Sequence, residues 1–252
     1  MDTISKANVV TVVTWPVAVS SARLQKLKAM LSLDERERLA GIPAYTRAQE
    51  FIVGRAGSRE LLARILGCQP GEVIFKSSAR GKPCLAFPNA PITFNLTHSG
   101  GICAFAFGQA SAIGIDIEQS HSHFHDVLET AFTSRESTQL ALIPAPRRQE
   151  AFFRAWVAKE AYLKATGDGI GGGFHNLELD LDALPELRPI AIGSNNERPD
   201  QWLFHDFKLG KSLVGAVAIK TDGRNFMVKI HHEGAARLHW ASELPTFAWT
   251  TK

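Results

Sequence analysis

The chain has 252 residues, of which 45% are hydrophobic and 21% are charged, and its formal net charge is +3. This composition is ordinary for a folded protein with a large core, in one domain or two compact halves, and it lacks the dense Lys/Arg stripe of a nucleic-acid-binding protein. Its three cysteines are scattered without metal-ligand spacing, and no segment reaches the roughly 20 apolar residues of a membrane span. We therefore expect a cytoplasmic protein that binds neither nucleic acid nor a membrane.

The first half of the sequence combines strand and helix patterns. An apolar run interrupted by one proline predicts an opening strand over 9–19. Ser32, which is followed by acidic residues, is a candidate N-cap, and apolar residues at helical spacing predict a long helix over 47–67 that ends at its glycine. A turn with a basic tip follows, then the segment ITFNLTHSGG and a predicted strand over 101–108.

The sequence GIDIE, at positions 114–118, places two carboxylates on a strongly apolar strand. Successive strand side chains point to opposite faces, so the isoleucines share one face, and Asp116 and Glu118 share the other. Only a short turn separates this strand from the one over 101–108, so we expect the two to pair as a hairpin. The acidic face is either a solvated sheet face or part of a site for a divalent cation.

A strong helix is predicted over 150–167, and it carries charges on its apolar side. On the helical wheel, Glu160 falls in the middle of the arc formed by aromatic and aliphatic residues, and Lys164 follows one turn later. Lys159 lies just off the rim of this arc. A buried carboxylate is costly unless it is paired, so either Glu160 and Lys164 form an ion pair, or the helix and the acidic strand share a cation such as Mg²⁺.

Two other patterns in the second half suggest sites that we do not favour. GDGIGG at 167–172 ends a helix, whereas a dinucleotide-binding glycine motif follows a strand and opens a helix, so we interpret it as a helix cap and turn. The alternating histidines in 121–125 could bind zinc, but they lack partner spacing, and a polar loop is the preferred interpretation. The remaining expected elements are strands within 175–184 and 212–221 and a C-terminal appendage over 226–252.

Five short motifs occur in the order and spacing of one known family. They are RGKP at 80–83, FNLTHS at 94–99, GIDIE at 114–118, FTSRE at 132–136 and WVAKEAYLKATGDGI at 156–170. Together they resemble the signature of 4'-phosphopantetheinyl transferases of the Sfp type, and the resemblance extends from residue 32 to residue 221. It implies an α/β (α+β) fold of two similar halves related by a pseudo-twofold axis.

The resemblance also implies an activity and a domain organisation. Such enzymes transfer the 4'-phosphopantetheine arm of coenzyme A to a serine of an apo acyl, peptidyl or aryl carrier protein, and they release adenosine 3',5'-bisphosphate. The carriers serve fatty acid, polyketide or nonribosomal peptide synthesis. The enzymes use Mg²⁺, or Mn²⁺, bind coenzyme A between the halves, and act as monomers at this size. For this chain, the implied halves are residues 1–110 and 111–225, with the metal site in the second half and the appendage after it.

The resemblance assigns the metal site and the catalytic residues. Asp116, Glu118 and Glu160 match the metal-binding acids, and Lys164 matches a lysine on the phosphates of coenzyme A. The implied catalytic residues are Glu160, Asp116 and Lys164. Glu160 also matches the residue proposed as general base for the carrier serine. Burial would raise its pKa and a metal would oppose that, and Asp116 or a metal-bound water are alternative bases.

Coenzyme A binding is implied for a second set of residues. Besides Asp116 and Lys164, this set consists of Arg47, Arg55, Arg80, Gly81, Lys82, Thr97, His98 and Lys159. Gly81 lies between two cations, and a glycine there suits close approach of the backbone to a phosphate. His98 matches a histidine near the 3'-phosphate. Without the resemblance, the alternatives are an exposed basic turn, a structural histidine, and a structural ion pair for Arg55.

The chain departs from the family pattern at two places near the implied 3'-phosphate site. Glu50 stands where many members carry an arginine, directly before the F-x-x-G-R of the first long helix, and Arg47 could replace that arginine. A basic pair of the family becomes Glu35 and Arg38. Both departures concern contacts to the 3'-phosphate and leave the implied metal site intact.

The sequence is compatible with three functions. The first is Mg²⁺-dependent phosphopantetheinyl transfer to a carrier protein, whose acidic helix we expect to meet Arg135, Arg147 and Arg148. The alternative is a catalytically silent homologue that binds coenzyme A or a carrier, against which the complete set of implied metal ligands argues. A third is a metal-dependent phosphodiesterase, but it would need an additional base to position water, and the sequence offers none.

Overall fold

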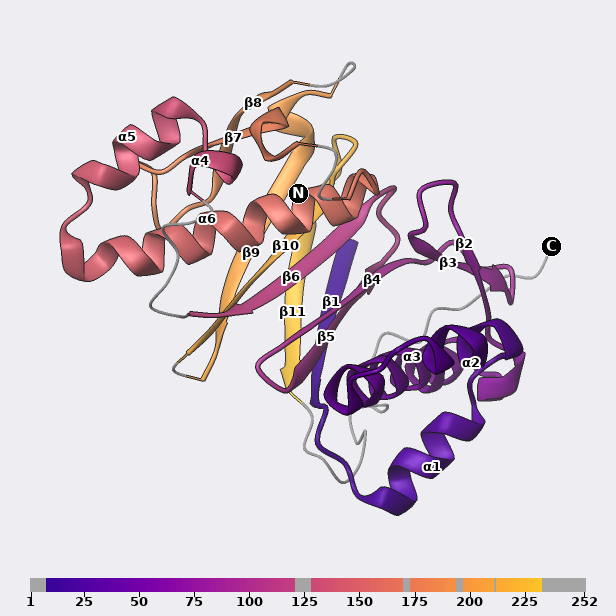
Figure 1. Cartoon of the computed structure of the whole chain (residues 1–252). Coiled ribbons are helices and arrows are strands. Elements are labelled where there is room, and N and C mark those ends of the chain that lie inside the picture. The colour runs from indigo at the N-terminus through magenta and orange to yellow at the C-terminus, as the bar shows by residue number, and fades with distance from the viewer. Residues whose placement is uncertain (1–7, 121–127, 170–172, 194–196, 211, 233–252) are drawn as a thin grey trace.

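The computed structural model describes residues 8–120, 128–169, 173–193, 197–210 and 212–232 (Figure 1). Its helices are α1 (Ser21–Ala29), α2 (Leu33–Ala40), α3 (Tyr45–Leu66), α4 (Leu128–Ala131), α5 (Ser134–Leu142) and α6 (Ala145–Thr166). Its strands are β1 (Asn8–Pro16), β2 (Ile74–Ser77), β3 (Pro83–Phe87), β4 (Thr93–Ser99), β5 (Ile102–Gly108), β6 (Ile113–Gln119), β7 (Leu177–Asp180), β8 (Arg188–Ile192), β9 (Trp202–Leu209), β10 (Leu213–Lys220) and β11 (Phe226–His232). The fold is a mixed α/β fold, as the sequence predicts.

Local sequence signals determine where the helices begin and end. Ser32 and Glu35 cap α2 reciprocally: Glu35 N donates to Ser32 Oγ at 3.4 Å, and Ser32 N donates to Glu35 Oε2 at 2.9 Å. The two longest helices, α3 and α6, end at Gly67 and Gly167, whose φ angles of 67° and 77° lie in the left-handed region. The predicted N-cap and both predicted glycine stops are therefore confirmed.

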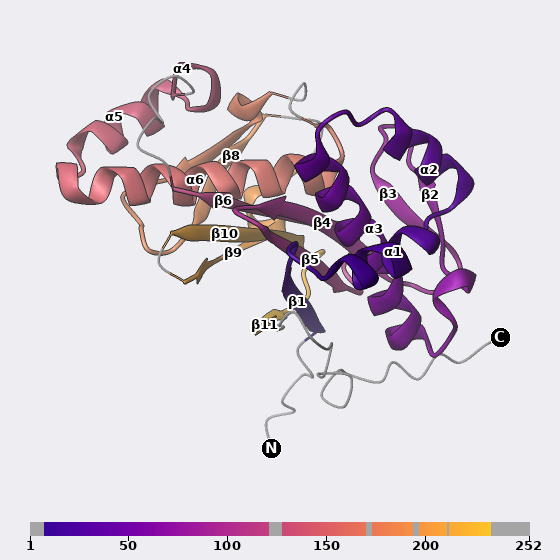
Figure 2. The same ribbon diagram turned by 60° about the horizontal axis from the view of Figure 1, so that its bottom comes forward.

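The first sheet has four strands in the order β11-β1-β5-β4, of which β1, β4 and β5 come from the first half of the sequence and β11 comes from Phe226–His232. β1 runs parallel to β11 and antiparallel to β5, and β4 and β5 form an antiparallel hairpin. The helices α1, α2 and α3 gather on one side of this sheet (Figure 2). A buried cluster there joins α3 to the sheet through Val13, Phe94, Phe105 and Phe107.

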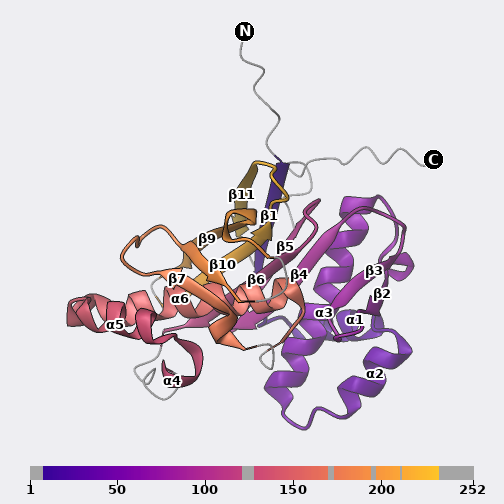
Figure 3. The same ribbon diagram turned by 90° about the horizontal axis from the view of Figure 1, so that it is seen from above.

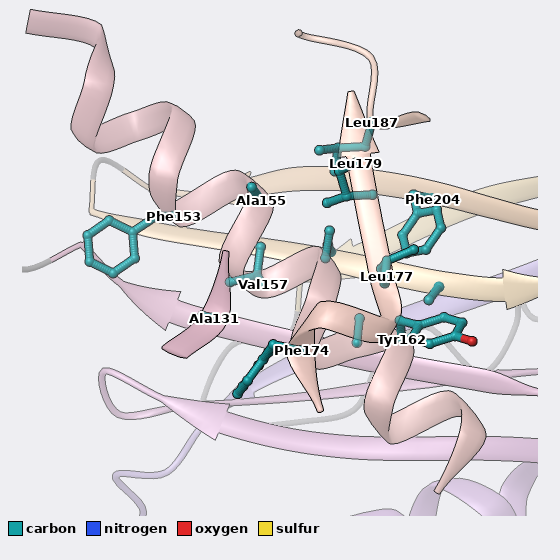
Figure 4. Close-up of a cluster of buried hydrophobic side chains, with 14 of the residues drawn as sticks. Ala131, Phe153, Ala155, Val157, Tyr162, Phe174, Leu177, Leu179, Leu187 and Phe204 are labelled. Carbon is teal, nitrogen blue, oxygen red and sulfur yellow. The ribbon is translucent and has the colours of Figure 1, made fainter. Parts of the chain in front are cut away.

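The second half contains the antiparallel sheet β6-β10-β9. Helix α6 packs along β6 and β10, and α5 and the β7–β8 hairpin lie close to the same helix (Figure 3). Figure 4 shows part of the core between these layers, in which Tyr162 of α6 lies near Leu177 and Phe204. Helix α6 is thus buried on more than one side.

A third buried cluster joins the two sheets. Its members come from β1, β5, β6, β9 and β10 and include Val10, Val12, Ala104, Ala106, Ile113, Ile115, Ile117, Phe207, Val217 and Ile219. The predicted isoleucine face of the GIDIE strand is therefore confirmed, and it faces the first sheet. The predicted hairpin between 101–108 and this strand is wrong. Both edges of β5 are occupied, by β1 and by β4, and β6 pairs with β10 instead.

Strand β11 lies at the start of the segment that the sequence suggests as an appendage. It pairs with β1 in register from Asn8↔Phe226 to Thr14↔His232. Residues 226–232 are therefore a strand of the first sheet rather than part of an appendage. Residues 233–252 lie outside the described residues, as do the alternating histidines in 121–125.

Candidate active site

Strand β6 and helix α6 make a close contact at Gly114. A Cβ added to Gly114 would lie well under 3.0 Å from the carbonyl oxygen of Ala161, closer than real Cβ atoms approach. Only glycine lets the strand come this near to the helix backbone. The contact brings Asp116, two residues further along β6, to Glu160 and Lys164 of α6.

Asp116 is buried, with 3% of its surface exposed. Its Oδ1 accepts hydrogen bonds from Lys164 Nζ at 2.5 Å and from Thr97 Oγ1 at 3.1 Å, and Lys164 Nζ also donates to Thr97 Oγ1 at 3.0 Å. Its Oδ2 is buried and has no hydrogen-bond partner in the part of the chain that the structure describes. Burial raises the pKa of Asp116, and Lys164, Thr97 and the nearby backbone N–H of Ile117 oppose this change.

Glu160 lies close enough to Asp116 and Glu118 for their negative charges to raise its pKa. Burial, followed by repulsion from Asp116, raises the pKa of Glu160 to about 7, and Glu118 adds to this while Lys164 opposes it. The ion pair that Lys164 forms among the described residues is with Asp116, not with Glu160. The three acids predicted from the strand and the helix therefore lie near one another.

The donor chemistry of these acids fits a divalent cation such as Mg²⁺. Carboxylate oxygens are the ligands that Mg²⁺ takes in proteins. A cation would satisfy the unpartnered Asp116 Oδ2 and would offset the repulsion that raises the pKa of Glu160. Within the described ranges, no group of three such side chains is already arranged to hold a metal ion. A shared ion would therefore require Asp116, Glu118 and Glu160 to converge.

Strand β4 of the first half reaches the same place through its polar side chains. Thr97 contacts Asp116, as described above, and Asn95 Oδ1 accepts a hydrogen bond from Ile115 N at 2.9 Å. Ser99 Oγ donates to Glu118 Oε2 at 3.0 Å. Asn95 and Ser99 are not among the site residues predicted from the sequence. Their signal is the alternation N-x-T-x-S within FNLTHS, which places the three polar side chains on one face of the strand.

Lys82 of the RGKP motif lies against the C-terminal end of α6. Its Nζ donates to the carbonyl oxygens of Ile113 at 2.8 Å and Ala165 at 3.0 Å. Burial lowers the pKa of Lys82 to about 8. A cation near the last helix carbonyls is favourable, and this one connects the first half to both β6 and α6.

Arg80 and Gly81 form the tip of the same turn, and both are exposed. Arg80 forms an ion pair with Asp168, just beyond α6. Gly81 has a φ of 82°, which favours glycine, and no atom lies within 4 Å of an added Cβ. The tip is therefore accessible to a ligand.

His98 and Arg47 lie near one of the departures from the family pattern. His98 Nδ1 is 3.5 Å from Glu50 Oε2, and 46% of the His98 side chain is exposed. Arg47 is exposed in the first turns of α3. Because the Glu50 carboxylate is adjacent to His98, it would oppose a phosphate placed there.

Arg55 makes the structural ion pair that the sequence analysis gives as its alternative role. Its Nε lies 3.4 Å from Glu35 Oε1, and its guanidinium lies over the ring of Phe75 at 5.3 Å from the ring centre. Arg59 Nη1 donates to the same Glu35 carboxylate at 2.9 Å. Glu35, one of the departures from the family pattern, is therefore the ion-pair partner of Arg55 and links α2 to α3.

Lys159 is placed away from these residues, which corrects its expected role in coenzyme A binding. Its side chain is fully buried, and Nζ contacts Glu136 Oε2 at 2.9 Å, Phe174 O at 3.0 Å and Leu177 O. An ammonium has three donors, so this arrangement uses them all. Glu136, from the FTSRE motif, is also fully buried and accepts a hydrogen bond from Leu179 N at 2.9 Å. This pair anchors α6 to the layer behind it, a role that the sequence analysis missed.

Comparisons with known proteins identify a family for this chain. The profile of the 4'-phosphopantetheinyl transferase superfamily matches residues 112–221. The 4'-phosphopantetheinyl transferase HetI of Nostoc sp. is 38% identical over 208 residues, which is 81% of this chain and 84% of the relative. A phosphopantetheinyl transferase of Thraustochytrium sp. is 30% identical over 88% of this chain and 80% of the relative.

A human protein is similar as well. The L-aminoadipate-semialdehyde dehydrogenase-phosphopantetheinyl transferase of Homo sapiens is 28% identical over 80% of this chain and 72% of the relative. The matched region contains β6 and α6, which carry Asp116, Glu160 and Lys164. The chain belongs to the 4'-phosphopantetheinyl transferase superfamily and is an enzyme with that activity.

Proposed function

We propose that the chain transfers the phosphopantetheine arm of coenzyme A to a serine of an apo carrier protein, with Mg²⁺ bound by Asp116, Glu118 and Glu160. The observation that carries this proposal is the placement of Asp116. It is a buried carboxylate with one oxygen bonded to Lys164 and the other without a partner among the described residues, and it lies beside Glu160. Mn²⁺ prefers the same kind of oxygen ligand and would replace Mg²⁺.

The proposed reaction is a phosphoryl transfer in which the protein supplies positioning and charge. Asp116, Glu118 and Glu160 would hold Mg²⁺, which would supply positive charge to neutralise the charge that develops on the leaving group. The carrier serine oxygen forms a bond to the phosphorus that bears the pantetheine arm, and the phosphorus–oxygen bond to adenosine 3',5'-bisphosphate breaks. Lys164, 30% exposed and beside Asp116, would contact the phosphates.

We assign the general base to Glu160. In the metal-free protein its pKa is about 7, and a bound cation would lower it, so its carboxylate would be ionised at neutral pH and could accept the proton of the serine hydroxyl. Asp116 is less suited to this role, because Lys164 and Thr97 already bond to its Oδ1. Burial thus opposes the effect of the cation and keeps this carboxylate more basic than it would be in an exposed metal site.

The proposed coenzyme A site lies between the halves, near Lys82, Arg80 and Thr97. Lys82 and Thr97 belong to the first half and bond to Ile113 and Asp116 of the second half. The exposed Arg80 would contact the nucleotide phosphates. Arg47 and His98 are the proposed contacts for the 3'-phosphate, and the Glu50 carboxylate beside His98 would weaken the second of these contacts. Arg55 and Lys159 are not part of this proposed site, because buried carboxylates already pair with them.

The acidic helix of the carrier would meet the α5–α6 corner. Arg135 is exposed in the first turn of α5 and Arg147 in the first turn of α6, and Leu142, at the end of α5, is 79% exposed. Arg148 is used within the chain, since its Nη2 donates to Ala141 O at 2.9 Å and to Ile143 O at 3.1 Å. We therefore restrict the proposed carrier contacts to the other two arginines.

We further propose a monomer of two related halves, 1–110 and 111–225. The two 22-residue helices α3 and α6, each ending at a left-handed glycine, support a pseudo-twofold relation between them. All three cysteines are free, which supports a reducing, cytoplasmic location. Among the described residues, none of the helices combines the length and the apolar character that crossing a membrane requires.

Incubation of the protein with coenzyme A, Mg²⁺ and an apo carrier protein tests the proposal. Mass spectrometry of the carrier should show an increase equal to the mass of the phosphopantetheine arm, and EDTA should abolish this increase.

Asp116→Asn should lower the transfer rate by at least about 100-fold, because it removes a charge that both the metal and Lys164 contact. The exposed Asp200→Asn is the matched control and should keep full activity. Carrier binding without any mass increase would favour the catalytically silent homologue, and full activity of Asp116→Asn would overturn the metal assignment.

A further inference from the structure

Strands β4 and β6 come from different halves of the chain and meet along polar side chains. They belong to separate sheets, the first with β5 and the second with β10. Asn95, Thr97 and Ser99 of β4 bond to β6 at Ile115 N, Asp116 Oδ1 and Glu118 Oε2. Three alternate residues of one strand therefore make a row of contacts, and two of these contacts end on acidic side chains.

Ser99 has its hydroxyl in a defined orientation. Gln119 N donates to Ser99 Oγ at 3.3 Å, and Ser99 Oγ donates to Glu118 Oε2 at 3.0 Å. A serine hydroxyl has one proton. Because the backbone N–H of Gln119 occupies a lone pair of the oxygen, the proton is directed at the carboxylate. Ser99 thus contacts β6 twice, once at the backbone and once at the acid.

The turn after Ser99 holds this contact in place. Gly100 has a φ of 55°, and a Cβ added there would lie 3.0 Å from Leu213 Cδ2 of β10. The turn between β4 and β5 therefore packs against the second sheet. Since backbone and turn both fix Ser99 relative to β6, its hydroxyl is a rigid donor to Glu118.

We propose that Ser99 is a positioning residue for the metal site: its hydroxyl, which comes from the first half, orients Glu118 of the second half so that this carboxylate can ligate the divalent ion. This inference rests on the proposed metal site. Hydrogen-bond partners of metal-binding carboxylates fix the orientation of the ligand, and their loss typically weakens metal affinity by about 10–100-fold. The divalent-ion affinity of the second half therefore depends on a strand of the first half.

The proposal is tested without any catalytic readout by titrating the full-length protein with Mn²⁺. Electron paramagnetic resonance measures the concentration of free Mn²⁺ at each step and so gives the binding affinity. Ser99→Ala should weaken Mn²⁺ binding by about tenfold or more. Ser99→Thr keeps the hydroxyl and should bind within a few-fold of the unchanged protein. The matched control is Ser120→Ala, because Ser120 lies two residues beyond Glu118 and donates to a backbone carbonyl, Ser212 O, at 3.3 Å.

The outcomes separate this inference from the proposed function. Equal Mn²⁺ affinity of Ser99→Ala, Ser120→Ala and the unchanged protein would overturn the positioning role and leave the metal site intact. Failure of the unchanged protein to bind Mn²⁺, with and without coenzyme A, would overturn the metal site itself and this inference with it. Thermal melting in EDTA checks folding, and all three variants should melt near the unchanged protein.

A kinetic measurement gives a second readout. The transfer rate of Ser99→Ala should require about tenfold more Mg²⁺ for half-maximal activity and should approach the normal maximum at saturating Mg²⁺. A purely structural role would lower the maximal rate at every Mg²⁺ concentration. A reduced maximum with an unchanged Mg²⁺ requirement would therefore contradict the proposal.

Discussion

Substitution of Gly114 by alanine tests whether close contact between β6 and α6 builds the active site. The added Cβ would lie well under 3.0 Å from Ala161 O and Ala165 N, both backbone atoms of α6. Backbone atoms inside a helix cannot rotate away, so the helix must shift by about 1.5 Å to restore an ordinary contact. Gly114→Ala is therefore expected to move α6 as a unit relative to β6.

Both stability and activity should fall. Overpacking typically costs 1–3 kcal/mol, and a clash with backbone on both elements places this case near about 3 kcal/mol, or a decrease of about 6–12 °C in Tm for a chain of this size. The shift also moves Glu160 and Lys164 away from Asp116, and a misplacement of about 1 Å can cost about 100-fold in rate. Calorimetry gives the Tm, and mass spectrometry of the carrier gives kcat/KM.

Gly71→Ala is the matched control for this experiment. No atom lies within 4 Å of a Cβ added to Gly71, and its backbone is not left-handed. This variant should keep the Tm and the transfer rate of the unchanged protein. If Gly114→Ala behaved like Gly71→Ala in both measurements, helix and strand would not be in backbone contact, and the idea that this contact brings Glu160 and Lys164 to Asp116 would be refuted.

Two further predictions concern buried charges of α6. Glu160 has a pKa of about 7 in the folded protein against 4.5 ordinarily, so the folded state binds more protons than the unfolded state between these values, and stability falls as pH rises from 4.5 through 7. The Glu160→Gln variant, melted in EDTA, should therefore be about 1–2 kcal/mol more stable than the unchanged protein at pH 8, after allowance for solvent screening. At pH 4.5 this difference in stability should be much smaller. A difference that does not change with pH would contradict this shift. Lys159→Met should cost about 3–5 kcal/mol, because it leaves the charge of Glu136 buried without its partner, and Lys159→Met combined with Glu136→Gln should recover part of this loss in urea unfolding. Equal destabilisation of the single and double variants would show that the buried charge is not the cause.

The features that the sequence predicts correctly are those set by local chemistry. The cap at Ser32 and the glycine stops of α3 and α6 depend on residues within one turn of the helix end. The opposite faces of GIDIE follow from the strand period alone. Glu160 stands out because a carboxylate interrupts an apolar arc, and the structure places it beside Asp116.

The features that the sequence misses depend on partners distant in the chain. A short turn suggests a hairpin of β5 and β6, but β1 and β4 occupy both edges of β5, and no local signal reveals them. The helical wheel places Lys159 at the rim because it assumes one buried face. Since α6 is covered both by its sheet and by the layer that contains β7, a residue off the main arc is fully buried and needs Glu136 as a partner.

The polar residues of β4 belong to the first half of the sequence but contact acids of the second half. The proposed metal ligands all lie on β6 and α6, yet Thr97 and Ser99 of β4 donate to two of them. Asn95 differs from these two, because it bonds to a backbone N–H and so fixes the position of the strand rather than of an acid. If the two sheets slid relative to each other, the hydroxyls of Thr97 and Ser99 would lose their hydrogen bonds to Asp116 and Glu118 at the same time. The acids themselves would keep their places on β6 and α6 but would lose the groups that orient them. The geometry of the acids is therefore a property of the joined halves, and neither half could hold it alone.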